Sequence, residues 1–273
     1  MKIETFDLWN SVPGMCEEVP KLTAYIPDEK KGDGAVVIFP GGAYTHRAKH
    51  EGEGYGVMLA EHGYTAFVVD YRVSPHKFPC QLLDARRGVK FARFYAEKYG
   101  IDKNKIAVMG SSAGGHLAAL VSTYFDEIDC EIEQDEIEKE EFIPNAQILC
   151  YPVIRILGKE IAHFGTGQNL LGVERHAICG EDFQPDMLVS ERTPQAFIWH
   201  TAADGGVSVL NSFEYAASLK RHNIDAEMHI FPHGAHGLGI CKGNANGADG
   251  EKVLEHDAQW TRLLLNWLEY IGF

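Results

Sequence analysis

Positive charge is scarce in this chain, where 25 lysines and arginines stand against 39 aspartates and glutamates and the formal net charge is −14. An acidic surface repels the phosphates of nucleic acids and of anionic membranes, so we expect neither as a partner. No run of residues approaches the roughly 20 apolar positions of a membrane-spanning helix. Residues 1–7 contain neither the apolar core nor the cleavage site of a signal peptide, and the sequence therefore predicts a cytoplasmic protein.

The motifs of common metal and nucleotide sites are also missing. The six cysteines form no C-x-x-C pair, which favours reduced, structural thiols in a chain of 273 residues. Residues 50–51 have no second histidine at the zincin spacing, residues 52–56 depart from the dinucleotide fingerprint, and no Walker A sequence is present. His229, His233 and His236 are poor candidates for a metal site because they straddle a predicted strand and its loop. We therefore expect neither a metal nor a cofactor.

Apolar runs of strand length alternate with helical segments along the chain. Continuous runs rich in β-branched residues predict buried strands over residues 35–39 and 65–69, and further strands are predicted over residues 106–109, 147–151, 196–200 and 226–231. Residues 21–26 alternate in polarity and indicate an edge strand. Helices are predicted over about residues 54–62, 79–99, 207–222 and 257–270. This alternation is typical of a mostly parallel sheet with helices on both faces, and we expect a single α/β domain over residues 1–273.

Two stretches interrupt the alternation. Residues 126–141 are strongly acidic and are expected to form a solvated surface segment. Residues 155–193 form a long insert with several glycines between two predicted strands, and inserts of that length are usually functional or disordered. Because this insert would leave the carboxyl edge of the sheet, we predict that it forms a small lid over a pocket, with a plain surface loop as the alternative.

A glycine-rich turn lies between the predicted strand at residues 106–109 and the helical segment after it. Residues 110–114 read Gly-x-Ser-x-Gly, which is the spacing of a nucleophile elbow. The two glycines leave room for a strained turn from strand to helix, and the oxygen of the central serine then stands exposed above the sheet. Ser111 in the same role would lack both flanking glycines, so Ser112 is the candidate nucleophile.

A serine hydroxyl is a weak nucleophile and needs a base, with a carboxylate to orient that base. In a parallel sheet these groups must sit in loops at the carboxyl ends of the strands. His236 follows the last predicted strand in a loop with glycines at 234 and 237, so it is the preferred base. His233 is a rival nearer the strand end, whereas His116 is expected to pack between helix and sheet and His200 to hydrogen-bond at the end of its strand.

Asp204 is the preferred carboxylate because it follows the predicted strand that ends at residue 200. Its position just before a helix is also typical of an N-cap, which is the alternative role. Asp182 and Asp186 belong to the insert, and Asp225 precedes its strand and would lie at the wrong end of the sheet. The resulting order of serine, aspartate and histidine along the chain is the order of the α/β-hydrolase fold.

The third requirement is a set of N–H donors for the negative charge that develops on a carbonyl oxygen under attack. The residue after the nucleophile, Ala113, supplies one N–H. A second donor is expected after the buried strand at residues 35–39, where Gly42 and Ala43 are both candidates. Losing one such donor typically costs about 3–4 kcal/mol of transition-state stabilisation.

With these residues in place, the chain resembles bacterial α/β-hydrolase esterases related to acetylxylan and other carbohydrate acetylesterases. The resemblance runs from residue 35 to the C-terminus. It rests on residues 40–44 with Arg47, 50–53, 68–72, 106–117, 151–153, 169–172, 199–201 with Asp204, and 229–238. Ser208 departs from the family pattern, which has proline at that position, and residues 126–141 look like an insertion. Pro40 stands in place of the histidine of the lipase-type H-G-G-G motif, which disfavours a lipase.

The resemblance implies that Ser112, Asp204 and His236 form a triad and that the activity is removal of short acyl groups, chiefly acetyl, from sugars. Tyr44 and Arg47 lie beside the predicted donor loop and are candidates to touch a sugar hydroxyl, with an ion pair to Glu51 or Glu53 as the alternative for Arg47. The expected partner is a small ester such as an acetylated sugar. A homo-oligomer is compatible with the sequence.

Three other functions share parts of this pattern. A serine peptidase acting on short peptides has the same fold and triad order, but no pocket for a charged N-terminus is recognisable in the sequence. A broad carboxylesterase differs only in substrate range. A non-catalytic binding protein of the same fold is disfavoured because three catalytic elements are intact.

Overall fold

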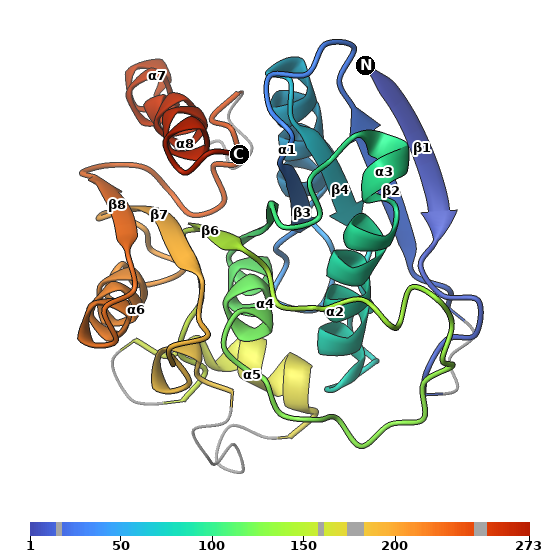
Figure 1. Cartoon of the computed structure of the whole chain (residues 1–273). Helices are drawn as coiled ribbons and strands as arrows, with labels where there is room; N and C mark the ends of the chain where they lie inside the picture. The colour runs from blue at the N-terminus through green and yellow to red at the C-terminus, as the bar shows by residue number, and fades with distance from the viewer. Residues whose placement is uncertain (15–17, 158–160, 174–182, 243–249) are drawn as a thin grey trace.

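The computed structural model describes residues 1–14, 18–157, 161–173, 183–242 and 250–273. One sheet of eight strands runs through it in the order β1-β2-β4-β3-β5-β6-β7-β8 (Figure 1). The pairings of β1 with β2 and of β2 with β4 are antiparallel, and the other five are parallel. The strands are β1 (Lys2–Asp7), β2 (Lys21–Ile26), β3 (Ala35–Phe39), β4 (Thr65–Val69), β5 (Ile106–Ser111), β6 (Ala146–Cys150), β7 (Gln195–Thr201) and β8 (Ala226–Phe231).

Helices cover both faces of this sheet, as the alternation in the sequence predicts. Helices α1, α7 and α8 lie on one face, and α2, α4 and α6 lie on the other (Figure 1). The helices are α1 (Lys49–Glu61), α2 (Cys80–Phe94), α3 (Ala96–Tyr99), α4 (Ala113–Val121), α5 (Phe164–Leu171), α6 (Leu210–Arg221), α7 (Glu251–Asp257) and α8 (Gln259–Tyr270), with a short 3-10 turn η2 (Pro185–Met187).

The central strand β3 shows how the sequence builds two cores. All of its side chains are fully buried, and successive residues point to opposite faces of the sheet. Val37 and Phe39 pack into the cluster that contains side chains of α2 and α4, and Val36 and Ile38 pack into the cluster that contains side chains of α1 and α8. Burying each of these side chains contributes about 1.5–3 kcal/mol.

Some predicted boundaries differ from the structure. The segment at residues 21–26 is not an edge strand, because β1 pairs along its outer side. The sequence did not reveal β1 because four of its six residues are exposed and it carries little apolar alternation. The predicted helix at 79–99 is divided at Tyr95 into α2 and α3. The predicted helix at 257–270 corresponds to α8, and the preceding helix α7 was not predicted.

The acidic stretch at residues 126–141 is only partly solvated, which corrects the prediction of a free surface segment. Arg87 on α2 is 2% exposed and donates to Asp135 at 2.7 Å and to Glu138 at 3.1 Å. Lys90, one turn along the same helix, donates to Glu138 at 2.5 Å. Two carboxylates of the run therefore dock the segment onto α2.

Two further expectations concern the state of the cysteines and the presence of membrane-spanning helices. Cys80, Cys130, Cys150 and Cys241 are free thiols, whereas Cys16 and Cys179 lie outside the described residues. Among the helices in the described ranges, none combines the length and the apolar character that crossing a membrane would require.

Candidate active site

Ser112 occupies a strained turn between β5 and α4. Its backbone has φ 53° and ψ −119°, a conformation that side-chain-bearing residues rarely adopt and that often marks a functional site. A Cβ atom added at Gly110 would lie 2.0 Å from the carbonyl oxygen of Gly114, and one added at Gly114 would lie 2.0 Å from that of Phe39. Neither glycine can be replaced without moving backbone, which is the steric reason for the Gly-x-Ser-x-Gly spacing.

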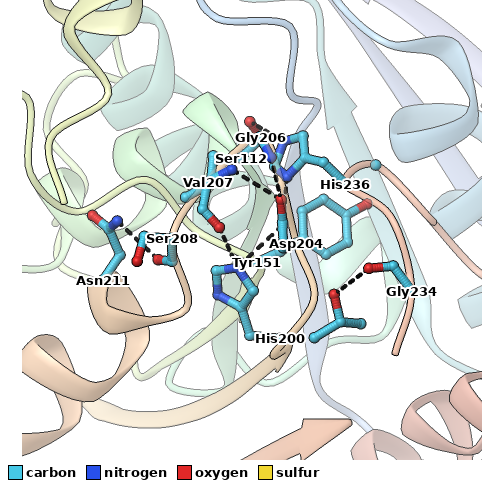
Figure 2. Close-up of polar contacts among 12 residues, drawn as sticks. Ser112, Tyr151, His200, Asp204, Gly206, Val207, Ser208, Asn211, Gly234 and His236 are labelled. Atoms are coloured by element: carbon cyan, nitrogen blue, oxygen red, sulfur yellow. Dashed lines mark hydrogen bonds and ion pairs between the residues drawn. The ribbon is translucent and has the colours of Figure 1, made fainter. Parts of the chain in front are cut away.

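Three loops bring Ser112, His236 and Asp204 into contact at the carboxyl ends of β5, β8 and β7 (Figure 2). Ser112 Oγ lies 2.8 Å from His236 Nε2, and His236 Nδ1 lies 2.7 Å from Asp204 Oδ2. A carboxylate oxygen accepts, so Nδ1 carries the hydrogen and Nε2 is free to accept from the serine hydroxyl. The arrangement can therefore move the serine proton onto the imidazole.

Asp204 is held as a carboxylate by four donors. Its side chain is 1% exposed, and Oδ1 accepts from the backbone N–H of Gly206 at 2.8 Å and of Val207 at 2.9 Å. Its other oxygen, Oδ2, faces the imidazoles of His200 and His236 (Figure 2). Burial by itself raises the pKa of Asp204, but the hydrogen bonds from His200 and His236 hold this pKa well below its usual range.

His200 also belongs to the site, although the sequence did not predict this role. Its Nε2 lies 3.2 Å from Asp204 Oδ2 and 3.1 Å from the carbonyl oxygen of Val207, so Nε2 must carry the hydrogen. Its Nδ1 then accepts from the hydroxyl of Ser212 at 2.8 Å. The expected hydrogen bonding at the strand end is present, and the four-residue spacing to Asp204 was the available signal for the additional contact.

The ring of His236 is enclosed by neighbouring groups. Tyr151, which follows β6, stands edge-on to it with ring centroids 5.2 Å apart and an interplanar angle of 73° (Figure 2). A Cβ atom added at Gly206 would lie 2.9 Å from Cβ of His236. These contacts restrict the rotation of the imidazole and keep Nε2 directed at Ser112.

The predicted donor loop lies beside the nucleophile. A Cβ atom added at Gly41 would lie 3.1 Å from Cβ of Ser112, and the next two residues, Gly42 and Ala43, have φ 129° and φ 52°. Within the described ranges, the backbone N–H groups of Gly42, Ala43 and Ala113 have no hydrogen-bond acceptor. Unpaired N–H groups next to a nucleophile are what a developing oxyanion requires.

The structure corrects the expected role of Tyr44 and the alternative ion pairs of Arg47, whereas a contact between Arg47 and a sugar hydroxyl stays a prediction. Tyr44 is fully buried and its hydroxyl lies 2.9 Å from His116 Nδ1, so it is not placed to touch a substrate. Arg47 forms neither predicted ion pair. It donates to the carbonyl oxygen of Tyr71 at 2.8 Å and faces Glu18 at 3.4 Å and Asp70 at 3.8 Å, carboxylates brought near it only by the tertiary fold.

His116 packs inside the protein, as expected, and links three segments. Its Nε2 donates to the carbonyl oxygen of Phe183 at 2.8 Å, so its Nδ1 is an acceptor for the hydroxyl of Tyr44. Complete burial lowers the pKa of His116 to about 4, which keeps the imidazole neutral at physiological pH.

The described part of the insert at 155–193 contacts the donor loop through α5. Asn169 Nδ2 donates to the carbonyl oxygen of Ala43 at 2.8 Å, and the carbonyl oxygen of Asn169 accepts from Lys77 at 3.0 Å. The insert therefore restrains the loop that carries two of the candidate oxyanion donors. The lid over a pocket stays a prediction.

The alternative candidates for the base and the carboxylate that the structure describes do not take part in the contacts between Ser112, His236 and Asp204. Asp186 forms an ion pair with Arg155 at 2.6 Å, Asp225 precedes β8 at the opposite end of the sheet, and His233 is exposed. Asp182 lies outside the described residues. No group of three metal-ligating side chains occurs among the residues that the structure describes.

Comparison with known proteins identifies a family and several relatives of this chain. Residues 22–219 match the BD-FAE family. The chain is 33% identical over 230 residues to endo-1,4-beta-xylanase B of Butyrivibrio fibrisolvens, covering 82% of this chain and 35% of that protein. It is 29% identical over 256 residues to the acetylxylan esterase of Xylanibacter ruminicola, covering 92% and 48% respectively. This chain thus spans about a third to a half of the length of these relatives.

A solved structure is similar over nearly its whole length. The acetyl ester-xyloside bifunctional hydrolase from Caldicellulosiruptor lactoaceticus superposes with a TM-score of 0.85 at 41% identity, covering 99% of this chain and 97% of that one. The alpha/beta hydrolase MGS-M1 from a deep-sea metagenome superposes with a TM-score of 0.74 at 28% identity. The predicted α/β-hydrolase fold is confirmed, and the chain belongs to the BD-FAE family of esterase-type α/β hydrolases.

Proposed function

We propose that this chain is a serine esterase that hydrolyses short-chain acyl esters, chiefly acetyl esters of carbohydrates. The observation that supports this most directly is the continuous path of hydrogen bonds from Ser112 through both ring nitrogens of His236 to Asp204, at 2.8 and 2.7 Å. A base between a serine and a buried carboxylate is the arrangement needed for nucleophilic acyl transfer.

In the first half of the reaction, His236 Nε2 takes the proton of Ser112 as Oγ attacks the carbonyl carbon of the ester. The carbonyl oxygen becomes an oxyanion that accepts hydrogen bonds from N–H groups of Gly42, Ala43 and Ala113. The ester C–O bond then breaks, and the alcohol leaves with the proton from His236. Asp204 stays ionised and stabilises the imidazolium that exists between these steps.

In the second half, water attacks the acyl-enzyme. His236 accepts a proton from the water, a second oxyanion forms in the same set of donors, and the bond between the acyl carbon and Ser112 Oγ breaks. The proton returns from His236 to Ser112 as the carboxylic acid leaves. The sum is one ester and one water converted to one alcohol and one acid, with the enzyme regenerated.

Acetylated sugars are the proposed substrates for two reasons. Two relatives that cover more than nine tenths of this chain are named acetylxylan esterase and acetyl ester-xyloside bifunctional hydrolase, which supports acetylated xylose-containing compounds. The net charge of −14 also favours neutral esters over strongly anionic ones.

Hydrolysis of nitrophenyl esters tests the reaction. We expect release of nitrophenol from the acetate to be much faster than from the octanoate, and Ser112→Ala to lower kcat by about 10⁴-fold or more. Ser122→Ala is the matched control, because Ser122 caps the far end of α4 and its hydroxyl donates only to the carbonyl oxygen of Ala118. Full activity in Ser112→Ala would exclude this mechanism.

The same protein distinguishes the alternatives. Turnover of aminoacyl-naphthylamides without hydrolysis of acetyl esters would indicate a peptidase, and failure to react with a fluorophosphonate would indicate a non-catalytic binding protein. Acetate release from a panel of acetylated oligosaccharides would identify the natural sugar and its position of acetylation.

A further inference from the structure

A buried carboxylate outside the proposed triad connects two loops of the site. These are the oxyanion loop, residues 40–43, and the histidine loop, residues 232–241. Glu51 lies in the first turn of α1 and is 3% exposed. Its Oε2 accepts from the backbone N–H of Gly41 at 2.9 Å, and its Oε1 accepts from the hydroxyl of Tyr151 at 2.7 Å.

Tyr151 continues this connection to the histidine loop. Its hydroxyl oxygen accepts from the backbone N–H of Gly239 at 2.9 Å, which leaves its own hydrogen for Glu51. Its ring also packs edge-on against His236. Three consecutive hydrogen bonds therefore run from Gly41 in the oxyanion loop to Gly239 in the histidine loop.

His50, the residue before Glu51, makes a parallel contact. Its Nε2 donates to the carbonyl oxygen of Gly237 at 2.9 Å, and a Cβ atom added at Gly239 would lie 2.9 Å from its Cδ2. The N-terminal turn of α1 thus contacts the histidine loop directly through His50 and indirectly through Glu51 and Tyr151, and it contacts the oxyanion loop through Glu51.

The position of Gly41 explains why this network matters for the reaction. A Cβ atom added at Gly41 would lie 2.4 Å from Glu51 Oε2 and 3.1 Å from Cβ of Ser112, so the residue is confined between the carboxylate and the nucleophile. The candidate donors Gly42 and Ala43 follow directly. A displacement of about 1 Å in such groups lowers reaction rates by about 100-fold.

We infer that Glu51 is a positioning residue, which holds the oxyanion loop and the histidine loop at the separation that the proposed reaction requires. This inference rests on the proposed function, because Glu51 acts through the donors and the base of that reaction. Burying a carboxylate is costly unless it is hydrogen-bonded, and here one donor is Gly41 of the oxyanion loop and the other is Tyr151, which itself holds Gly239 of the histidine loop.

Kinetics of three variants test this role. Glu51→Ala removes both contacts, and we expect kcat for nitrophenyl acetate to fall about 100-fold with KM changed less than about threefold. Glu51→Gln keeps an acceptor for Gly41 and an amide for Tyr151, so it should retain at least about a tenth of the wild-type kcat. Tyr151→Phe keeps the ring beside His236 but not the hydroxyl, and we expect a fall of about tenfold. Glu53→Ala is the matched control, since this glutamate is 48% exposed and pairs with Lys49.

A transition-state analogue separates positioning from folding. A trifluoromethyl ketone forms a hemiketal oxyanion with Ser112, so its inhibition constant should rise in Glu51→Ala in proportion to the loss of kcat/KM. A purely structural Glu51 would lower the melting temperature but leave kcat per folded molecule and this inhibition constant unchanged.

The outcomes are distinguishable from a failure of the proposed function. Suppose that the wild type hydrolyses acetyl esters through Ser112, and that Glu51→Gln and Tyr151→Phe both keep the kcat and inhibition constant of the wild type. If Glu51→Ala then also keeps these values, or fails to fold, only the inference about Glu51 is overturned. If Glu51→Ala does not fold while the other two lose activity as expected, the inference stands on those two variants.

Discussion

His200 Nε2 lies 3.2 Å from Asp204 Oδ2, the same carboxylate oxygen that His236 contacts at 2.7 Å. One oxygen atom therefore receives hydrogen bonds from two imidazoles, whose rings come from the end of β7 and from the loop after β8. The second imidazole limits the rotation of the carboxylate. Because the His200 ring is itself held by Ser212 and Val207, the orientation of Asp204 is determined by the core of the protein.

Replacing His200 tests this restraint. We expect His200→Leu to lower kcat about tenfold with little change in KM, because a hydrogen bond to a charged group contributes about 1.5–3 kcal/mol and Asp204 keeps its other three donors. His200→Gln, whose amide can donate in place of Nε2, should lose less. Steady-state kinetics on nitrophenyl acetate give the comparison, and equal kcat in all three proteins would show that His200 has no part in orienting Asp204.

The contact between the insert and the oxyanion loop gives a second prediction. Asn169→Ala removes the donor to the carbonyl oxygen of Ala43, so we expect kcat to fall about threefold to tenfold while the melting temperature changes little. Asn10→Ala is the control, because that exposed amide donates to Asp135 at 3.3 Å on a distant surface. A wild-type kcat in Asn169→Ala would mean that the loop is held without the insert.

The buried imidazole of His116 predicts how stability depends on pH. The pKa of His116 is about 4 in the folded protein, below its ordinary value of 6.5, so the neutral form is favoured by folding. The contribution of the neutral His116 imidazole to the free energy of unfolding is complete above about pH 6.5, and it is lost as the pH falls from 6.5 towards 4. The loss between pH 7.5 and 4.5 is about 2–3 kcal/mol of unfolding free energy.

His116→Gln checks this prediction because glutamine does not titrate. We expect the variant to be less stable than the wild type at pH 7.5, but to lose about 2 kcal/mol less between pH 7.5 and 4.5. Urea unfolding at the two pH values measures the difference, in which the titration of other groups largely cancels. If the free energy of unfolding fell by the same amount between pH 7.5 and 4.5 in the two proteins, the expected titration of His116 would be contradicted.

Much of the fold was predictable because its signals are local. The buried strands at 35–39 and 65–69 are continuous apolar runs, and the structure has β3 and β4 over those residues. The exposed edge strand β1 was missed because little of it is buried. The division of the helix at 79–99 was also missed, since a break at Tyr95 leaves the apolar spacing on both sides intact.

The sequence by itself determined the candidate nucleophile and its order relative to Asp204 and His236. Steric limits on a turn act over five residues, and strand ends identify which loops share one edge of a parallel sheet. The tertiary structure alone decided what depends on distant contacts: the burial of Tyr44, the partners of Arg47, the second imidazole on Asp204 and the carboxylate of Glu51 between two loops. Tyr151 and Glu51, for example, are 100 residues apart in sequence, and only packing of α1 against the sheet brings them within 2.7 Å.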